Sequence, residues 1–395
     1  MEFNSINFDK FVELWYGLSM IKRIYENLGD YFHPKEVLIL YGPRRVGKTT
    51  LLQKFLNSTH LKYRLETGDN IRVQDVFSSS DLSRIQEFLG GYQLLAIDEA
   101  QMIPQIGHGL KLTIDNMENI QVIATGSSSF ELANEVGEPL TGRKTVLTLY
   151  PISQLELSSE QNRANLKDKL DEFLIFGSYP QIVTAKNRDE KIRIIEELVN
   201  SYIFKDILAL EKVKGSKVLL NLLKLLAFQV GSEVSQNELS INLGIDVKTV
   251  GRYLDLLEKT FVITRLGGFS RNLRSEIVNK SKYYFIDNGI RNGVISQFNS
   301  LSDRNDVGQL WENFIITERL KKRSYQHIYG QAYFWRTYSQ QEIDLIEERD
   351  GKLFIFECKW SSKNKSSTPK EWLANYPQAE KLVIITPDNY LDFVA

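Results

Sequence analysis

The chain has 395 residues, which is enough for two or three domains with cores of their own. Its 49 basic and 50 acidic residues nearly cancel, which excludes a global basic field, so any contact with nucleic acid must come from local patches. The single cysteine excludes a disulfide framework and fits a reducing compartment. Neither a signal peptide nor an apolar run long enough for a bilayer is visible, so we expect a cytoplasmic protein without membrane contact.

The N-terminal part of the chain predicts an α/β fold. Residues 1–34 carry apolar residues at helical spacing, which predicts one or two helices before the first strand. Between residues 36 and 150, strand-like and helical stretches alternate, and this pattern is typical of a parallel sheet covered on both faces. The expected strands are 36–41, 61–65, 93–98, 120–125 and 145–149, with helices around 49–57, 81–89 and 106–117.

A glycine-rich loop between the first strand and the first helix matches G-x-x-x-x-G-K-[ST], the Walker A pattern. A strand, such a loop and a helix start together aim backbone N–H groups at an anion, so we expect ATP as ligand. Lys48 is expected to reach the β- and γ-phosphates, and the Thr49 hydroxyl to bind Mg²⁺. The residues expected around the phosphates are Gly42, Pro43, Arg44, Arg45, Val46, Gly47, Lys48, Thr49 and Thr50.

Two carboxylates follow the third strand, in the Walker B position. Ligands bind at the carboxyl end of open α/β sheets, where this strand delivers Asp98 and Glu99. We expect Asp98 to contact Mg²⁺ through water and Glu99 to polarise the attacking water in ATP hydrolysis.

Two further sites follow along the chain. The strand at 120–125 ends in a serine cluster, and Ser127 or Ser128 is a candidate sensor of the γ-phosphate, although serines also suit an ordinary loop and helix cap. Arg143, before the last strand, is a candidate arginine finger in cis or in trans, with a salt-bridged surface arginine as the alternative.

Together these motifs resemble the AAA+-type ATPases of bacteria and archaea that carry a C-terminal domain of unknown function. The resemblance implies ATP hydrolysis and a possible homo-oligomer, and a serine stands where the sensor asparagine of many AAA+ proteins is usual. It rests on Gly-Pro-Arg-Arg-Val-Gly-Lys-Thr-Thr (42–50), Ile-Asp-Glu-Ala-Gln (97–101), Ala-Thr-Gly-Ser-Ser (124–128), Gly-Arg (142–143), Leu-Tyr-Pro-Ile-Ser (149–153), Phe-Gly-Ser-Tyr-Pro (176–180) and Tyr-Phe-Ile-Asp-Asn-Gly (284–289).

The middle of the chain is predicted to be helical and then to form a DNA-binding unit. Residues 154–212 read as a lid or connector, with helices at Leu166–Phe176 and Ile192–Leu210. Three helices and a strand within 213–280 then predict a winged helix-turn-helix, with double-stranded DNA as the expected partner and packing against protein as the alternative. The basic side chains expected to face DNA are Lys248 and Arg252 on the third helix and Arg265, Arg271 and Arg274 in the wing.

The last domain, 281–395, resembles the PD-(D/E)xK nuclease superfamily. A helix from Val307 to Lys322 is followed by two strand-like runs around Asp350-Gly351, which is a strong hairpin signal. The resemblance implies a restriction-endonuclease-like α/β domain in which Lys359 offsets developing charge and Glu312, Asp344 and Glu357 bind Mg²⁺. Surface charges on an edge hairpin are the alternative.

The hairpin also predicts a register. If Asp350 and Gly351 are the loop residues, Arg349 pairs with Lys352, and Asp344 lies opposite Glu357 with their carboxylates roughly 3–5 Å apart. Leu345, Ile343 and Cys358 are then expected on the other, apolar face.

With residues 1–153 as the ATPase domain, three functions remain open. They are an ATP-regulated nuclease, an ATP-switched DNA-binding regulator whose nuclease-like domain is inactive, and a signalling ATPase that binds protein partners.

Overall fold

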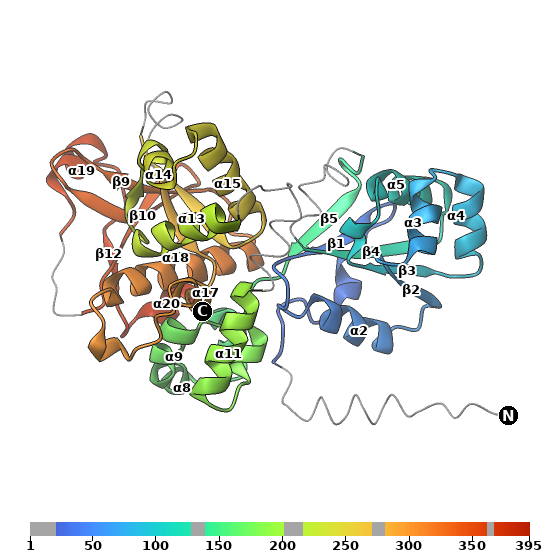
Figure 1. Cartoon of the computed structure of the whole chain (residues 1–395), viewed down its shortest axis with the longest axis horizontal. Coiled ribbons are helices and arrows are strands. Elements are labelled where there is room, and N and C mark those ends of the chain that lie inside the picture. The colour runs from blue at the N-terminus through green and yellow to red at the C-terminus, as the bar shows by residue number, and fades with distance from the viewer. Residues whose placement is uncertain (1–20, 128–138, 201–215, 271–280, 362–366) are drawn as a thin grey trace.

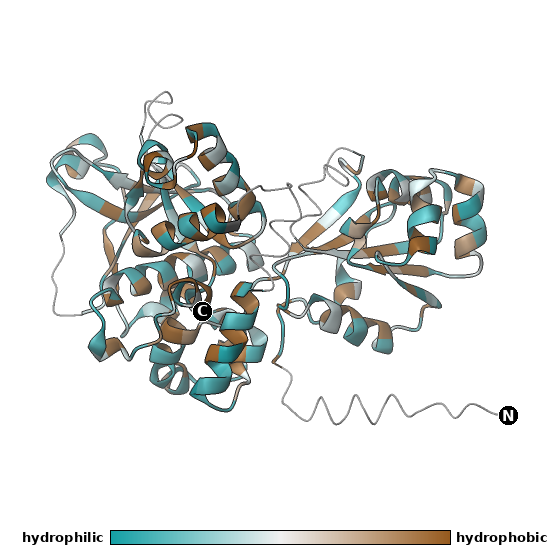
Figure 2. Cartoon of the chain, in the orientation of Figure 1, coloured by the Kyte–Doolittle hydropathy of each residue, from teal (hydrophilic) through white to brown (hydrophobic). Residues whose placement is uncertain are grey.

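The computed structural model describes residues 21–127, 139–200, 216–270, 281–361 and 367–395. Figure 1 shows two lobes, connected by the chain that follows the last strand of the first sheet. Each lobe is built around one sheet, with five strands in the first and seven in the second. In Figure 2, the strands of the first lobe are mostly brown, and the outward sides of its helices carry the teal, hydrophilic residues. Each sheet therefore forms the centre of a separate lobe.

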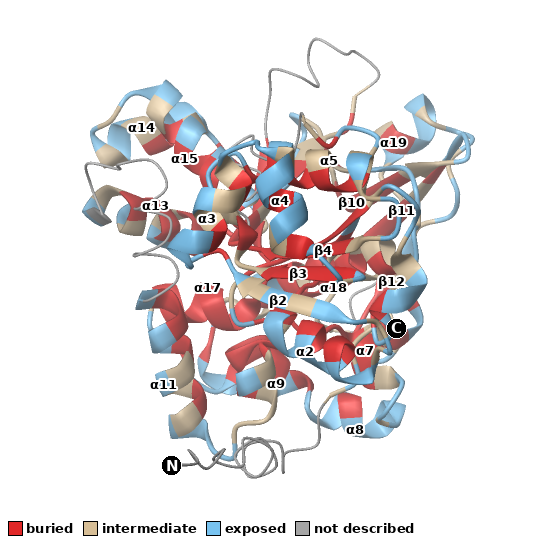
Figure 3. Cartoon of the chain, turned by 90° about the vertical axis from the view of Figure 1, so that its right-hand side faces the viewer, coloured by how far each residue is buried: buried red, intermediate tan, exposed pale blue. Residues whose placement is uncertain are grey.

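The first lobe contains the predicted parallel sheet. Its strands have the order β2-β3-β4-β1-β5, and every neighbouring pair is parallel. Alternate residues of β1 enter two core clusters on opposite faces, Leu38 and Leu40 in one and Ile39 and Tyr41 in the other. The two edge strands, β2 and β5, are less buried than the strands between them, and Figure 3 shows β2 tan and pale blue beside red β3. The strands are β1 (Val37–Tyr41), β2 (Tyr63–Thr67), β3 (Leu94–Asp98), β4 (Gln121–Gly126) and β5 (Lys144–Thr148).

The helices of this lobe largely match the prediction. The three predicted helices are present as α2 (Lys48–Ser58), α4 (Leu82–Leu89) and α5 (Ile106–Asn116). A further helix, α3 (Ile71–Ser78), was not predicted; it starts where the Asn70 side chain accepts a hydrogen bond from the Arg72 N–H. The helices expected in residues 1–34 fall partly outside the described residues, and the described part contains only the 3₁₀ turn η1 (Leu28–Tyr31).

A run of short helices connects the lobes. It contains α7 (Gln154–Ser158), α8 (Arg163–Asp168), α9 (Leu170–Phe176), α10 (Pro180–Val183) and α11 (Arg188–Leu198). The helix predicted at Leu166–Phe176 is interrupted at Lys169, and the one predicted at Ile192–Leu210 continues into residues outside the described ranges. Helices α9 and α11 pack on α17 (Asn288–Val294) of the second lobe.

The second lobe has one mixed sheet with the order β12-β11-β10-β9-β7-β8-β6. Because β7 and β8 pair with each other and β7 pairs with β9, the strands on both sides of the predicted domain boundary at residue 280 share this sheet. The strands are β6 (Glu233–Val234), β7 (Ile263–Gly268), β8 (Ser281–Phe285), β9 (Gln331–Arg336), β10 (Glu342–Arg349), β11 (Lys352–Cys358) and β12 (Val383–Ile385). The remaining helices are α13 (Ser216–Phe228), α14 (Gln236–Leu243), α15 (Val247–Lys259), α18 (Val307–Tyr325), α19 (Lys370–Asn375) and α20 (Tyr390–Val394). Among the described residues, no helix combines the length and apolar character needed to cross a membrane.

The register predicted for the β10–β11 hairpin is confirmed. Arg349 pairs with Lys352 and Leu345 with Phe356. A bulge on the β9 side of β10, between Ile343 and Ile346, breaks the expected alternation of side chains. Leu345 and Cys358 therefore join the core cluster that contains α18, whereas Ile343 joins a separate cluster around Trp372. The prediction that Leu345, Ile343 and Cys358 share one face was wrong.

Candidate functional site

The loop between β1 and α2 has the backbone that its glycines permit. Gly42 has φ +147°, and a Cβ there would lie 2.0 Å from the Leu149 carbonyl oxygen, so only glycine fits. Gly47 has φ +97° and caps α2. Lys48, buried at the start of α2, donates from Nζ to the Gly42 and Pro43 carbonyls at 2.8 and 2.9 Å. The lysine ammonium is thus held inside the loop by neutral acceptors.

Burial changes the acidity of this lysine. It lowers the pKa of Lys48 to about 8, although Glu99 and Asp98 act in the opposite direction. A ligand that brings negative charge into the loop is therefore expected to bind a proton with it.

The predicted Walker B residues lie next to the loop. Thr49 Oγ1 donates to Asp98 Oδ2 at 2.8 Å, and Thr125 Oγ1 donates to the other Asp98 oxygen. The same Thr125 oxygen accepts from the Glu99 N–H at 3.2 Å, and Gln101 Nε2 donates to Glu99 Oε2. The Asp98 carboxylate therefore connects the carboxyl ends of β3 and β4 with the start of α2.

Thr125 was missed by the sequence analysis. The structure places it at the end of β4, the strand between β1 and β3, where it contacts both acidic residues. The sequence predicted the following serines, Ser127 or Ser128, as the sensor of the γ-phosphate. Ser127 is buried one residue after the strand, and Ser128 lies outside the described residues. A threonine two residues before a candidate sensor serine is the only signal in the sequence.

Arg143 does not approach the P-loop, the phosphate-binding loop between β1 and α2, of its own chain. Strands β1 and β5 are parallel, with Val37 opposite Lys144, so the residue before β5 lies at the edge where β1 begins. The P-loop follows the other end of β1. Arg143 instead forms an ion pair with Asp115, near the end of α5. The prediction of an arginine finger in cis was wrong, and the alternative of a salt-bridged arginine describes the contact.

Arg23, another residue that the sequence did not reveal, connects the P-loop to the connector. Its guanidinium donates to the Val46 carbonyl in the loop, to the Tyr150 carbonyl at 2.7 Å and to Glu156 Oε1 at 2.8 Å. A second contact joins Arg45 of the loop to Glu197 of α11 at 2.7 Å. The phosphate-binding loop is therefore in direct contact with the segment that leads to the second lobe.

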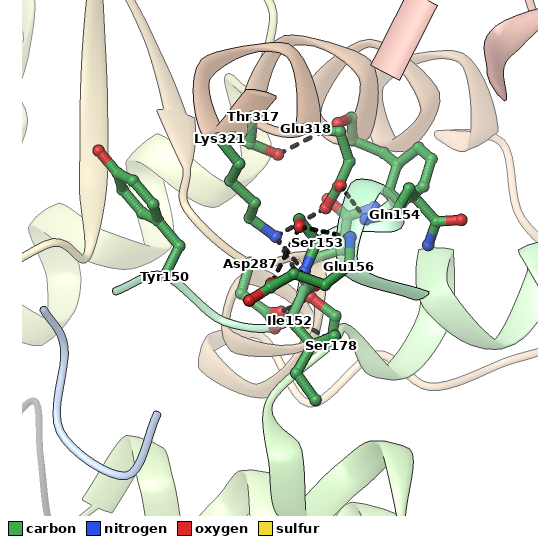
Figure 4. Close-up of polar contacts among 12 residues, drawn as sticks. Tyr150, Ile152, Ser153, Gln154, Glu156, Ser178, Asp287, Thr317, Glu318 and Lys321 are labelled. Carbon is green, nitrogen blue, oxygen red and sulfur yellow. Dashed lines mark hydrogen bonds and ion pairs between the residues drawn. The ribbon is translucent and has the colours of Figure 1, made fainter. Parts of the chain in front are cut away.

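Glu156 belongs to a buried polar network at the base of the second lobe (Figure 4). Its carboxylate and Ser153 form a capping box at the start of α7, and the next N–H, that of Gln154, donates to Glu318 Oε2 at 2.6 Å. Glu318 is paired with Lys321 at 2.6 Å within α18. Burial raises the pKa of Glu318, although Lys321 opposes this change.

The network continues to the remaining motifs. Lys321 also donates to Ser178 Oγ at 3.3 Å, and the Ser178 N–H donates to Asp287 Oδ2 at 2.7 Å. Helix α18 thus brings together three motifs that are spread over more than a hundred residues of the sequence, at 149–153, 176–180 and 284–289.

The predicted metal ligands in the last domain are arranged around a lysine. The buried Lys282 ammonium lies 3.1 Å from Glu312 Oε1 and also pairs with Glu342. Tyr284 donates to the same Glu312 oxygen at 2.7 Å. Burial opposes the charge of Lys282, but Glu312, Glu342 and Asp344 outweigh it and raise its pKa. An internal cation therefore occupies the centre of this acidic group.

The two strand carboxylates have other partners. Asp344 accepts from the Cys358 N–H at 2.7 Å, and burial, followed by the charge of Glu312, raises its pKa well above the usual value. Glu357 pairs with Lys359 at 2.6 Å. Within the described ranges, no group of three or more His, Cys, Asp or Glu side chains has an arrangement that could hold a metal ion. This finding argues against the expected Mg²⁺ site of Glu312, Asp344 and Glu357.

The predicted DNA-facing residues have mixed surroundings. Lys248 and Arg252 are exposed on α15. Arg265, on β7, donates from Nε to Ser281 Oγ at 2.7 Å. Arg271 and Arg274 lie outside the described residues.

Three family matches cover most of the chain. Residues 34–158 match the family described as AAA domain. Residues 167–301 and 307–393 match two families, each described as a domain of unknown function (DUF8612 and DUF4143). The AAA domain together with the C-terminal DUF4143 domain supports an AAA-type P-loop ATPase, as the sequence motifs predicted.

Two relatives of similar sequence are each described as an uncharacterized protein. One from Mycobacterium tuberculosis is 24% identical over 361 residues, covering 91% of this chain and 78% of the relative. One from Haemophilus influenzae is 26% identical over 339 residues, covering 79% and 80%. Domain III of the Thermotoga maritima replication initiation protein DnaA covers 47% of this chain and 88% of its own at 19% identity, but the TM-score of 0.28 is too low to support an argument. The two relatives match most of the chain without indicating a function.

Proposed function

We propose that the chain is an ATP hydrolase that uses the nucleotide state of its first lobe to switch a DNA-binding second lobe. The proposed hydrolase activity rests on one group of contacts at the carboxyl edge of the parallel sheet. Thr49 and Thr125 both donate to Asp98, and Thr125 also accepts from the neighbouring Glu99 N–H. The match of this region to the AAA domain supports it.

The loop residues fit a Mg-bound triphosphate. The Thr49 hydroxyl directly, and the Asp98 carboxylate 2.8 Å away through water, would hold Mg²⁺. When bound, the ion neutralises charge on the β- and γ-phosphates. Lys48 exchanges its two loop carbonyls for phosphate oxygens, and the N–H groups at the start of α2 bind the phosphates. Glu99 orients the attacking water and accepts its proton, while Gln101 fixes the carboxylate.

The switch rests on Arg23. Its guanidinium holds a P-loop carbonyl at one end and Glu156 at the other, and Glu156 caps the helix whose first N–H binds α18 of the second lobe. Because the loop must adjust when phosphates replace its internal acceptors, this arginine transmits the adjustment to the buried network.

The second lobe binds DNA through a winged helix-turn-helix formed by α13, α14, α15 and the antiparallel pair β7–β8. The order of these elements and the exposed Lys248 and Arg252 on α15 support this proposal. The adjoining PD-(D/E)xK-like region does not cut, because Lys282 takes the place that a divalent cation needs between the carboxylates.

A second candidate function is binding of a protein partner on the same helices. Ile241 on α14 is 80% exposed and Val247 at the start of α15 is 37% exposed, and apolar side chains in this position favour a protein surface over DNA.

One experiment separates these proposals. The purified protein is incubated with plasmid and linear duplex, with and without ATP, Mg²⁺ and Mn²⁺, and both ATP hydrolysis and DNA are followed. We expect ATP hydrolysis and nucleotide-dependent duplex binding without cleavage. Metal-dependent cutting contradicts the inactive nuclease-like region, and hydrolysis without DNA binding favours the protein partner.

A further inference from the structure

A cavity of about 380 Å³ lies in the second lobe, and its lining comes from residues 264–347. Its wall is the last half of α18, and its floor is formed by strands β7, β9 and β10. The volume falls within the range of small-molecule pockets. The apolar part of the lining comes from Ile316, Leu320, Ile328, Ala332 and Leu345.

The polar part of the lining has an excess of positive charge. Glu347, fully buried on β10, is surrounded by the guanidiniums of Arg319, Arg323 and Arg349. Arg319 uses both carboxylate oxygens, at 2.7 and 2.9 Å. Although burial alone would raise the pKa of Glu347, the hydrogen bonds and charge of Arg319, with Arg323 and Arg349, lower it. The carboxylate is therefore ionised, and it neutralises only one of these three cations.

The two remaining arginines keep unused donors. The Arg323 Nε is 3.8 Å and the Arg349 Nε 3.3 Å from Glu347, but neither buried nitrogen makes a hydrogen bond within the part of the chain that the structure describes. Arg323 donates from Nη2 to the Gly330 carbonyl at 2.7 Å. Burial and repulsion by Arg319 and Arg349 lower the pKa of Arg323 despite the attraction of Glu347. Buried donors without acceptors destabilise a protein unless a ligand satisfies them.

We propose that this cavity is a binding site for a small organic phosphate. A phosphate group supplies negative charge and several acceptors to the guanidinium of Arg323, which prefers planar, paired contacts with such oxyanions. The lining by Ile316, Leu320 and Ile328 receives the apolar part of the molecule. A second phosphate site, separate from the P-loop, makes the second lobe responsive to a metabolite.

The test uses full-length protein carrying Lys48→Ala, so that the P-loop contributes no phosphate site. Calorimetry at constant ionic strength follows binding of two probes, inorganic phosphate and phenyl phosphate, with phenol as a reference. We expect both phosphates to bind, phenyl phosphate more tightly, and phenol not to bind. Adding Arg323→Gln should weaken phenyl phosphate binding about tenfold or more, the effect of losing a charged hydrogen bond.

Two further variants keep the test decisive. Ala332 pairs with Glu347 across β9 and β10, so its side chain shares the face of the cavity, and Ala332→Phe should block phenyl phosphate even if Arg323→Gln does not fold. Arg163→Gln removes an exposed arginine elsewhere and should leave both affinities unchanged. The proposal is overturned if the Lys48→Ala protein does not bind phosphate. It is also overturned if adding Arg323→Gln and adding Ala332→Phe each leave the affinity for phenyl phosphate equal to that of the Lys48→Ala protein. Neither result bears on ATP hydrolysis, because the P-loop is already disabled.

Discussion

The P-loop and the acidic group of the second lobe both place a buried lysine beside carboxylates, yet the two ammonium groups have opposite surroundings. Lys48 donates to two loop carbonyls, and burial lowers its pKa to about 8. Lys282 is paired with Glu312 and Glu342, and these carboxylates with Asp344 raise its pKa. A lysine held by neutral acceptors is available to an anionic ligand, whereas a lysine held by carboxylates already balances their charge. Similar residue types therefore predict opposite functions.

The largest effect should follow from removing the first lysine. Lys48→Ala is expected to abolish ATP binding, because the phosphates lose the ammonium that is buried inside the loop. Binding of a fluorescent ATP analogue measures this loss. Lys54→Ala is the matched control, since it removes an exposed lysine of the same helix and should retain affinity. An unchanged affinity in the Lys48→Ala protein would show that the loop does not bind the triphosphate.

The next effect separates binding from chemistry in the first lobe. Glu99→Gln should retain ATP binding and reduce hydrolysis about a hundredfold or more, because the amide cannot accept a proton from the attacking water. Phosphate release and nucleotide affinity are measured on the same preparation. Glu87→Gln, an exposed change on α4, should leave both values unchanged. Hydrolysis at the wild-type rate in Glu99→Gln would remove Glu99 from the proposed mechanism.

The second lysine is tested by an apolar side chain of similar length. Lys282→Met leaves the partly buried Glu312 and Glu342 without their cation, so the second lobe should lose stability, by at most about 3–5 kcal/mol. Mn²⁺ should restore part of this loss in Lys282→Met and have no such effect on the wild type, because the ion can then replace the ammonium. Thermal unfolding with and without Mn²⁺ measures both changes. The Lys48→Ala protein keeps Lys282 but has a disabled P-loop. Stabilisation of this protein by Mn²⁺ would contradict the assignment of Lys282 as the resident cation.

A smaller effect concerns the DNA-facing helix. Replacing Lys248 and Arg252 together by Gln should weaken duplex binding and reduce the salt slope by about two, because each of these side chains is expected to neutralise about one phosphate. Fluorescence anisotropy at several salt concentrations gives the slope. Lys217 and Lys224, exposed on α13, provide a control pair of equal charge. An unchanged slope in the α15 variant would favour the protein partner.

Local patterns predicted much of this structure, and long-range contacts account for the errors. The strands of the parallel sheet and the register at Asp350-Gly351 follow from spacing and turn chemistry, which act over a few residues. The bulge in β10 and the insertion of Lys282 depend on neighbouring strands and helices, which a single sequence does not show. Arg143 was misplaced although it precedes the predicted strand, because in a parallel sheet the residue before a strand lies at the edge opposite the loop that follows β1.

The smallest expected effect is the uptake of a proton by Lys48 when the nucleotide binds. Burial lowers the pKa of Lys48 to about 8, so a growing fraction of the unliganded lysine is neutral as the pH rises above neutrality. Bound phosphates favour the ammonium and raise this pKa again. Binding should therefore take up about a tenth of a proton at pH 7 and about nine tenths at pH 9, a range in which the phosphates themselves are largely ionised.

Calorimetry in two buffers of different ionisation enthalpy measures this uptake, and the affinity for the nucleotide should fall over the same pH range. Lys282 should contribute nothing, because its carboxylates keep its pKa above the range tested. Uptake that does not change between pH 7 and pH 9 would mean that Lys48 remains charged in the empty loop. In that case the two lysines would differ only in their partners and not in their protonation.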